Sequence, residues 1–225
     1  METRLLIFDM DGVLVDVTDS YRQTIAETVK LFTGIEMTNR EIQAFKNRGN
    51  SNNDWDLTME LVRAKGGTAT KQDVIDAFQK VYLGNHNDGL IARERWLPRD
   101  GLLERLAQHF RLALFTGRER WEASFTLSKF APGIVFDPIV GMEDVQCEKP
   151  HPEGLLKIME MLEPQEVYYI GDATDDCRAA RAAQVSFIGV VNTQNPLRKE
   201  LESLFRQEGA RAVISDVNKL ERVLL

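Results

Sequence analysis

The sequence contains few of the residues that build disulfide frameworks and zinc sites. Its 225 residues include two cysteines, Cys147 and Cys177, without a CxxC pair, and three histidines at His86, His109 and His151. Structural zinc sites need cysteine and histidine at close spacing, so this scatter does not suggest one. Disulfide-rich secreted domains need several paired cysteines, so we expect a reducing, cytoplasmic setting.

The sequence also lacks long hydrophobic runs and an excess of basic residues. Lys and Arg number 28 against 35 Asp and Glu, which gives a net charge of −7. This balance argues against a nucleic-acid or anionic-membrane binder, although a local basic pocket for a small anion is compatible with it. No run approaches the ~20 apolar residues of a membrane span, and we expect no signal peptide.

Six short and almost wholly apolar segments predict buried β-strands. They are residues 4–10, 111–117, 134–141, 166–172, 185–191 and 212–215. Continuous apolar runs are typical of parallel strands that are covered on both faces. From residue 97 onward, segments with helical periodicity separate these strands. The alternation predicts an α/β fold with a doubly wound, Rossmann-like parallel sheet, whose ligands bind at the carboxyl ends of the strands.

Residues 17–96 interrupt the alternation. They contain four amphipathic segments that predict helices, residues 20–32, 38–47, 55–67 and 71–84, and no convincing strand. Thr38 and Glu41 have the spacing of a capping box, and Gly34 stands where a helix C-terminal cap is expected. We therefore predict an α/β core domain of residues 1–16 and 97–225, and a helical domain of residues 17–96 inserted into it.

Polar residues follow the predicted strands at the edge where ligands are expected. Asp9 and Asp11 follow the first strand, and being two residues apart they point to the same side of an extended chain. At the ends of later strands come Thr116, Gly117, Lys149, Gly171, Asp172, Asp175 and Asp176. So many acids in one place would repel one another. An all-oxygen ligand set suits Mg²⁺, and Lys149 with Thr116 would suit a phosphate.

Each of these residues also has a simpler interpretation. Asp9 and Asp11 fit a turn before Gly12, and Thr116 fits the N-cap of the next helix. Lys149 fits a solvated lysine before a proline turn. Asp175 and Asp176 fit the first turn of a helix, where the helix dipole favours acids. Arg118 and Arg120 fit surface residues at a helix start and are assigned no role.

Four segments together resemble the motifs of the haloacid dehalogenase-like (HAD) hydrolase superfamily. They are DMDGVLVD (9–16), FTGR (115–118), KPHPEG (149–154) and GDATDD (171–176), in this order. The helical insertion after the first segment resembles the cap domain of the phosphoglycolate phosphatase and β-phosphoglucomutase branch. The resemblance covers essentially the whole chain, and it implies a Rossmann-like core with a helical cap.

The resemblance implies a role for each matching residue. Asp9 would be the nucleophile that forms an aspartyl-phosphate, and Asp11 would be the general acid and base. Mg²⁺ would be held by Asp9, the main-chain carbonyl of Asp11 and Asp172, with Asp176 supporting the metal site. Thr116, Gly117 and Lys149 would bind the phosphoryl group. The dehalogenases of the superfamily lack the second acid, so Asp11 favours phosphoryl transfer; the role of Asp175 stays open.

A polar segment of the insertion, residues 46–56, is the candidate for substrate selection. In this branch a cap loop over the active site selects the substrate. The candidate residues are Lys46, Arg48, Gly49, Asn50, Asn52, Asn53 and Trp55. The alternative is a solvated loop in which Asp54 caps the next helix and Trp55 is buried in the cap.

The sequence thus predicts a Mg²⁺-dependent phosphatase acting on a small phosphorylated metabolite, such as phosphoglycolate or a sugar phosphate. We expect neither nucleic acid nor membrane as a partner, and the sequence does not indicate an oligomeric state. A phosphomutase would share every one of these residues. A non-catalytic regulatory protein on the same scaffold is a third reading, which the intact set of Asp9, Asp11, Lys149 and Asp172 disfavours.

Overall fold

The structure is a computed structural model that describes residues 4–225. The chain divides into two compact units, and each is described separately. Unit 1 comprises the residues up to Val15 and those from Trp96 onward, and unit 2 is Asp16–Arg95. The chain therefore leaves unit 1 shortly after its first strand and returns to it near Trp96.

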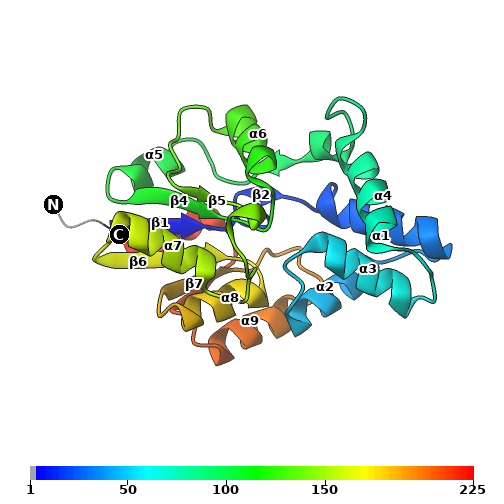
Figure 1. Cartoon of the computed structure of the whole chain (residues 1–225). Coiled ribbons are helices and arrows are strands. Elements are labelled where there is room, and N and C mark those ends of the chain that lie inside the picture. Colours follow the sequence, from blue (N-terminus) through cyan, green and yellow to red (C-terminus); the bar gives the residue numbers. More distant parts are fainter. Residues whose placement is uncertain (1–3) are drawn as a thin grey trace. The chain divides into compact units, whose positions relative to one another are not determined.

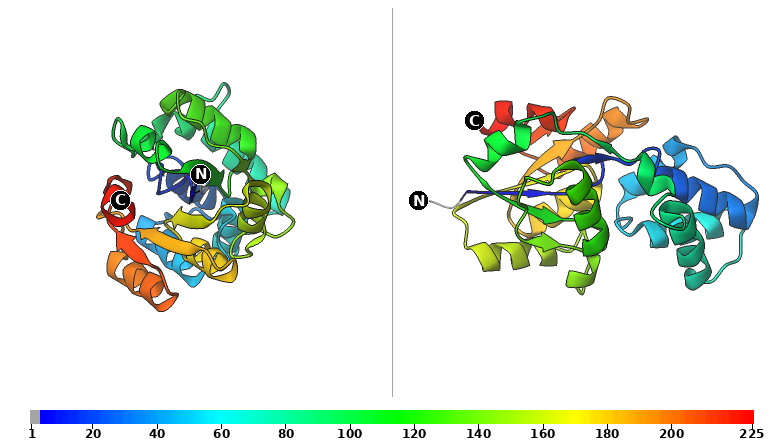
Figure 2. Two further views of the ribbon diagram at one scale, coloured as in Figure 1. Left: turned by 90° about the vertical axis from the view of Figure 1, so that its left-hand side faces the viewer. Right: turned by 90° about the horizontal axis from the view of Figure 1, so that it is seen from above.

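Unit 1 is built on a parallel sheet of six strands in the order β5-β4-β1-β6-β7-β8. The predicted doubly wound fold is confirmed. In sheet order, the strands are β5 (Ile139–Val140), β4 (Arg111–Phe115), β1 (Arg4–Phe8), β6 (Glu166–Gly171), β7 (Ser186–Val190) and β8 (Ala212–Ile214). Figure 1 shows the strands side by side, and the left view of Figure 2 shows them from their amino ends.

Helices cover both faces of this sheet. Figure 1 shows α5 (Leu102–Ala107) and α6 (Arg120–Phe130) on one face. The other face carries α7 (Glu153–Leu162), α8 (Thr174–Ala182) and α9 (Arg198–Gln207). This division follows from right-handed crossovers, because the chain steps along the sheet in one direction before β5 and in the opposite direction after it. The short α10 (Glu221–Leu224) ends the chain.

The apolar strands supply the core because alternate side chains point to opposite faces of the sheet. Leu5 and Ile7 belong to a buried cluster with residues of α7, α8 and α9, including Cys177. Leu6 and Phe8 are also fully buried, and the ring of Phe8 lies 6.0 Å from that of Phe136. Strands with both faces buried explain why the sequence showed continuous apolar runs.

Three strands differ from the prediction. The segment 134–141 forms a strand only at Ile139–Val140, since Pro138 has no N–H to extend the ladder. Two-residue strands were missed altogether: β2 (Val15–Asp16) pairs with β3 (Arg95–Trp96) in a separate sheet, so residues 17–96 are not entirely without strand. Segments this short carry no periodicity that could reveal them.

Unit 2 contains the four predicted helices, α1 (Tyr21–Thr33), α2 (Asn39–Arg48), α3 (Asp54–Ala64) and α4 (Lys71–Leu83). The predicted capping box of Thr38 and Glu41 is confirmed at the start of α2. Gly34 ends α1 with a positive φ of 72°, which glycine adopts without strain. A 3₁₀ turn, η1 (Leu90–Arg93), precedes β3.

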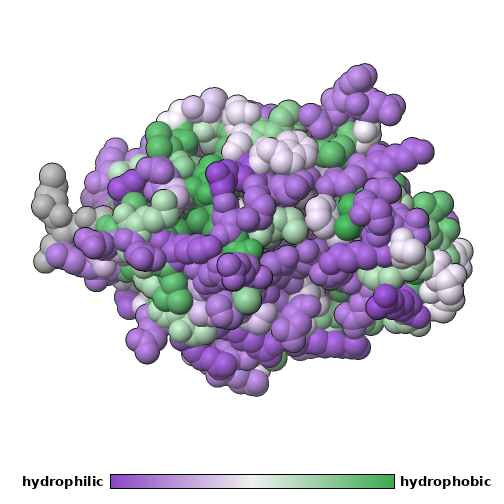
Figure 3. Space-filling model, in the orientation of Figure 1, coloured by the Kyte–Doolittle hydropathy of each residue, from purple (hydrophilic) through white to green (hydrophobic). Residues whose placement is uncertain are grey.

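One face of the molecule is mostly polar in the space-filling view. Figure 3 shows one face of the molecule on which hydrophilic residues predominate. Among the described helices, none has the length and apolar character needed to cross a membrane.

Candidate active site

The first strand places two acids at the carboxyl edge of the sheet. Asp9 directly follows β1 and is 5% exposed, and its backbone N–H donates to the carbonyl of Ile170 at 2.8 Å. Gly12 follows with a φ of +73°, and a Cβ placed there would lie 1.9 Å from Oδ2 of Asp172. Glycine is thus required both by the turn and by the close approach of Asp172. The turn lets Asp172, which directly follows β6, lie close to the end of β1.

The end of β6 and the start of α8 supply two further carboxylates. Asp176 is buried in the first turn of α8, and its Oδ2 accepts hydrogen bonds from the backbone N–H groups of Asp172 (3.2 Å) and Ala173 (3.0 Å). Its Oδ1 accepts from Lys149 at 2.8 Å and from the hydroxyl of Tyr169 at 2.7 Å. Because both oxygens of Asp176 are engaged, this residue is suited to orient Lys149 and Asp172 around a ligand.

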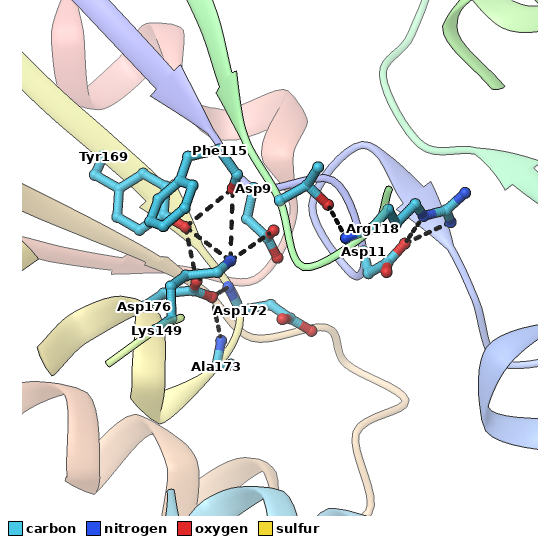
Figure 4. Close-up of polar contacts among 10 residues, drawn as sticks. Asp9, Asp11, Phe115, Arg118, Lys149, Tyr169, Asp172, Ala173 and Asp176 are labelled. Carbon is cyan, nitrogen blue, oxygen red and sulfur yellow. Dashed lines mark hydrogen bonds and ion pairs between the residues drawn. The ribbon is translucent and has the colours of Figure 1, made fainter. Parts of the chain in front are cut away.

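Lys149 is the centre of this hydrogen-bond network (Figure 4). It lies between β5 and α7, is 4% exposed, and donates to Asp9 Oδ1 at 2.9 Å and to the Tyr169 hydroxyl at 3.0 Å, in addition to Asp176. Burial alone would lower the pKa of Lys149, but the carboxylates of Asp176 and Asp9 outweigh it and hold that pKa above its ordinary value. The ammonium group therefore stays charged.

The carboxylates outnumber this one lysine. Asp9, Asp172 and Asp176 each place a carboxylate oxygen within 4.8 Å of the other two. Burial raises the pKa of Asp9 well above its ordinary value; Lys149 lowers it, whereas the neighbouring acids Asp176, Asp11 and Asp172 raise it further. A divalent cation with oxygen ligands would relieve this repulsion and favour ionised Asp9. The donor set therefore fits such a cation, with Asp9 and Asp172 as side-chain ligands.

A second group of possible metal ligands lies on the loop that carries Lys149. Cys147, His151 and Glu153 also place one ligand atom each within 4.8 Å of the others, but Cys147 and His151 are exposed. The Glu153 carboxylate already accepts from the N–H groups of Gln146 and Cys147 and pairs with Lys157. The buried carboxylate cluster is the better cation site.

The end of β4 contributes Thr116 and Gly117. Thr116 is 1% exposed, and its hydroxyl accepts from the N–H of Arg118 at 3.2 Å. The interpretation of Thr116 as a helix cap is wrong, because Glu119 occupies the N-cap of α6. Leu114 pairs with Phe8 across the sheet, so Thr116 and Gly117 lie at the same edge as Asp9.

The structure corrects the expectation that Arg118 is a surface residue. Arg118 is 2% exposed, whereas the sequence indicated a surface residue, and its Nε and Nη2 donate to Oδ1 of Asp11 at 2.9 and 2.5 Å. Arg120, by contrast, is exposed and pairs with Asp144. Tyr169 was also missed, since a tyrosine in an apolar strand gives no sign that its hydroxyl joins a charged cluster. For Arg118, position next to Thr116 and Gly117 was the one available signal.

Asp175 is buried in the first turn of α8, at 2% exposure. The structure thus agrees with its interpretation as a first-turn residue, and its role stays open. Cys177 in the same helix packs in the core, and burial raises its pKa to about 12.

In unit 2, some of the proposed substrate-selecting residues have local structural roles. Asn53 is the N-cap of α3 and accepts from the N–H groups of Trp55 (3.0 Å) and Asp56 (3.3 Å), so the interpretation of Asp54 as the cap is wrong. Asp54 instead pairs with Lys46 at 2.7 Å. Trp55 is half-buried.

The loop between α2 and α3 has two residues with positive φ. Gly49 has a φ of 85° and Asn50 a φ of 57°, a conformation that asparagine tolerates better than most residues. Arg48 is exposed and stacks on the ring of Phe45 at 4.2 Å. With Asn52 half-buried, the loop presents polar groups, and its part in substrate selection stays a prediction.

Known proteins resemble this chain in sequence and in fold. The sequence model of a family described as haloacid dehalogenase-like hydrolase matches residues 6–190. This range includes all four segments that carry the resemblance. A conserved haloacid dehalogenase-like protein of Agrobacterium tumefaciens has a solved structure with a TM-score of 0.75 at 20% identity, covering 99% of this chain and 97% of that one. This likeness supports the fold.

Two relatives are similar in sequence over most of the chain. Imidazoleglycerol-phosphate dehydratase of Phytophthora nicotianae is 33% identical, and the alignment covers 93% of this chain and 50% of that protein. The chain thus spans about half the length of this relative. Phosphoglycolate phosphatase 1 of Pseudomonas aeruginosa is 25% identical, with 89% of this chain and 75% of that protein covered.

Proposed function

The chain belongs to the haloacid dehalogenase-like hydrolase family. We propose that it is a Mg²⁺-dependent phosphatase that hydrolyses a small phosphomonoester through an aspartyl-phosphate on Asp9, an activity supported by its similarity to a phosphoglycolate phosphatase. The observation that carries the proposal is the buried network in which Lys149 joins Asp9 to Asp176 beside Asp172. A structural ion pair would need one acid for one lysine. Three acids clustered beside one lysine fit a divalent cation, and such a cation would in turn bind a phosphoryl oxygen.

In the first step, an oxygen of Asp9 attacks phosphorus and the bond to the leaving oxygen breaks, with Asp11 donating a proton to that oxygen. In the second step, water attacks the aspartyl-phosphate, Asp11 takes the water proton, and Asp9 is restored as a carboxylate. Mg²⁺, held by Asp9, Asp172 and the main-chain carbonyl of Asp11, would supply charge neutralisation at the phosphoryl oxygens.

The remaining residues would hold the phosphoryl group in place. The three N–H donors of Lys149 are engaged by Asp9, Tyr169 and Asp176, so its fixed ammonium would act on the phosphoryl group as a nearby positive charge. The hydroxyl of Thr116 and the N–H of Gly117, at the neighbouring strand end, would donate to other phosphoryl oxygens. Asp176 would act through Lys149 and Asp172, because both of its oxygens are already engaged.

For the substrate, the similarity to phosphoglycolate phosphatase supports a small phosphorylated metabolite such as phosphoglycolate or a sugar phosphate. Unit 2 would act as the cap that selects it. A second candidate is an alkyl phosphate that bears an imidazole ring. It is favoured by the relative of about twice this length, which is named for an activity on imidazoleglycerol phosphate.

The test is a substrate panel assayed for phosphate release with and without Mg²⁺. The panel contains phosphoglycolate, a hexose phosphate, imidazoleglycerol phosphate and p-nitrophenyl phosphate, and Asp9→Asn is the control. We expect Mg²⁺-dependent release by the wild-type protein and a loss of at least ~1,000-fold in the variant, because the nucleophile is gone. Activity that survives Asp9→Asn contradicts the mechanism. Isomerisation of the hexose phosphate without phosphate release would instead identify a phosphomutase.

A further inference from the structure

The guanidinium of Arg118 is held at both ends inside unit 1. Arg118 is among the largest fully buried side chains. Its Nε and Nη2 donate to Asp11, and its Nη1 donates to the hydroxyl of Thr126 on α6 at 3.1 Å. Burying a charged group costs several kcal/mol unless it is paired and hydrogen-bonded. The burial of Arg118 therefore depends on its partners, and Asp11 is a charged partner that accepts two of its N–H groups.

The two hydrogen bonds to Asp11 end on the same oxygen. Nε lies 2.9 Å and Nη2 2.5 Å from Oδ1. Within residues 4–225, no hydrogen bond reaches Oδ2 of Asp11, and this side chain is 27% exposed. A purely structural arginine–carboxylate pair commonly uses both oxygens of the carboxylate. In Asp11, Oδ1 is anchored by Arg118, whereas Oδ2 stays available for proton transfer.

The orientation of Asp11 suits proton transfer to a leaving group. In Figure 4, the carboxylate of Asp11 faces Arg118, and Asp9 and Lys149 lie on the other side. In phosphoryl transfer the attacking and leaving oxygens are roughly in line on opposite sides of phosphorus. A group that protonates the leaving oxygen must therefore stand away from the nucleophile. A carboxylate held toward Arg118, away from Asp9, meets this requirement.

We propose that Arg118 is a positioning residue, which anchors Asp11 through Oδ1 and so assigns Oδ2 as the oxygen that exchanges the proton. When the bond from phosphorus to the leaving oxygen breaks, the proton on Oδ2 moves to that oxygen. When water attacks the aspartyl-phosphate, its proton returns to Oδ2. Arg118 keeps its own protons throughout. This inference rests on the proposed phosphatase mechanism.

The test compares Arg118→Met with the wild-type protein on phosphomonoesters whose leaving groups differ in basicity. An alkyl leaving group needs the proton from Asp11, whereas p-nitrophenolate needs it far less. We expect Arg118→Met to lower kcat by roughly 10- to 100-fold on an alkyl phosphate, and much less on p-nitrophenyl phosphate. Arg120→Met, at the exposed arginine two positions along, is the matched control and leaves kcat unchanged.

A double-mutant cycle shows whether Arg118 acts through Asp11. Asp11→Asn removes the proton transfer but keeps an oxygen for the anchor. Adding Arg118→Met to Asp11→Asn should cost little more, because the step that Arg118 serves is already lost. The proposal is overturned if the kcat losses of the two single variants multiply in the double variant, or if the loss in Arg118→Met is equal for all leaving groups. A rise in kcat would also overturn it, since Arg118 would then hold Asp11 in a position unsuited to proton transfer.

Two further measurements keep the outcome decisive. If Arg118→Met does not fold by circular dichroism, Thr126→Val keeps the charge of Arg118 and removes the hydrogen bond from its Nη1. The same leaving-group dependence is then expected in weaker form. Asp9→Asn, assayed in parallel, helps to distinguish a failure of the phosphatase mechanism from a failure of the role proposed for Arg118. Absence of turnover by the wild-type protein on every ester would remove the mechanism itself. Normal turnover with an unaffected Arg118→Met would overturn only the role of Arg118.

Discussion

The two acids that follow β1 are two residues apart, and they have different partners. Asp9 is almost fully buried and pairs with Lys149 at 2.9 Å. The side chain of Asp11 is 27% exposed and pairs with Arg118 at 2.5 Å. Each cation comes from a different loop, after β5 for Lys149 and after β4 for Arg118. The different environments fit different tasks, a fixed nucleophile for Asp9 and a more accessible proton carrier for Asp11.

Tyr169 offers a test of how tightly the buried network must be held. Its hydroxyl lies between Lys149 and Asp176, and burial, with the charges of Asp176 and Asp9, raises its pKa well above the ordinary value, so it stays a neutral donor. Tyr169→Phe removes the hydroxyl without changing the ring. We expect a loss of about 1–3 kcal/mol in the free energy of unfolding and a lower kcat.

The matched control for this change is Tyr168→Phe. Tyr168 is the neighbouring residue on β6, but its hydroxyl bonds to the half-buried Glu166, away from Lys149. Urea unfolding and steady-state kinetics on both variants give the comparison. Equal kcat in Tyr169→Phe and Tyr168→Phe would show that the network does not depend on this hydroxyl.

At the scale of elements, the sequence predicted the strands and helix starts that depend on residues close together in the chain. Apolar runs gave the strands, since burial on both faces demands them, and the spacing of Thr38 and Glu41 gave the start of α2. The carboxyl ends of parallel strands then placed Asp9, Lys149 and Asp172 at one edge. The short β2 and β3 and the true cap of α3 at Asn53 were missed, because two residues have no periodicity and Asn53 and Asp54 are equally good caps.

The role of Arg118 could not be found in the same way. Its partner Asp11 lies 107 positions away in the sequence, and its burial depends on how β4, α6 and the turn after β1 pack. An arginine next to a helix start is most often exposed, so residue type and position favoured the wrong interpretation. The resemblance to a family identified the strand ends but assigned nothing to this residue.

The capping box of α2 predicts a pH dependence for unit 2. Hydrogen bonds from Lys65 and from the N–H and hydroxyl of Thr38 lower the pKa of Glu41 from 4.5 to about 2. Because the folded pKa is below the unfolded one, the stabilisation is present above about pH 4.5 and is lost as the pH falls toward 2. Glu41→Gln should therefore unfold at lower temperature than the wild-type protein at pH 6, and the difference should shrink as the pH approaches 2.

Calorimetry of the two proteins between pH 6 and pH 2, in parallel with Glu60→Gln, measures this difference. Glu60 is an exposed glutamate on α3, so its substitution controls for the loss of one surface charge. A difference between Glu41→Gln and the wild-type protein that stays constant over this range would mean that the ionised carboxylate of Glu41 does not stabilise α2.

At the scale of the whole molecule, excess negative charge and the site are connected. The chain carries a net charge of −7, and three of its acids meet in one cluster, two of them buried and Asp172 half-buried. A folded state that gathers carboxylates is destabilised by their repulsion unless a cation accompanies them. Conversely, a cation that binds the folded state but not the unfolded chain stabilises the fold by mass action. Activity and stability should therefore respond to the same ion.

This connection predicts that Mg²⁺ raises the melting temperature at neutral pH. The pKa of Asp9 in the folded protein is raised, so its contribution to stability is present below its unfolded pKa and is lost as the pH rises through the raised value. Without a cation, Asp9→Asn should thus be more stable than the wild-type protein at pH 7, and the advantage should shrink toward pH 4.

At 100 times its Kd, Mg²⁺ should add about 2.7 kcal/mol to the free energy of unfolding of the wild-type protein. This corresponds to a rise of roughly 5–10 °C in its melting temperature, and the rise should be much smaller in Asp9→Asn. Thermal scans with Mg²⁺ and with EDTA measure both effects, and equal Mg²⁺ shifts in the two proteins would place the cation away from Asp9.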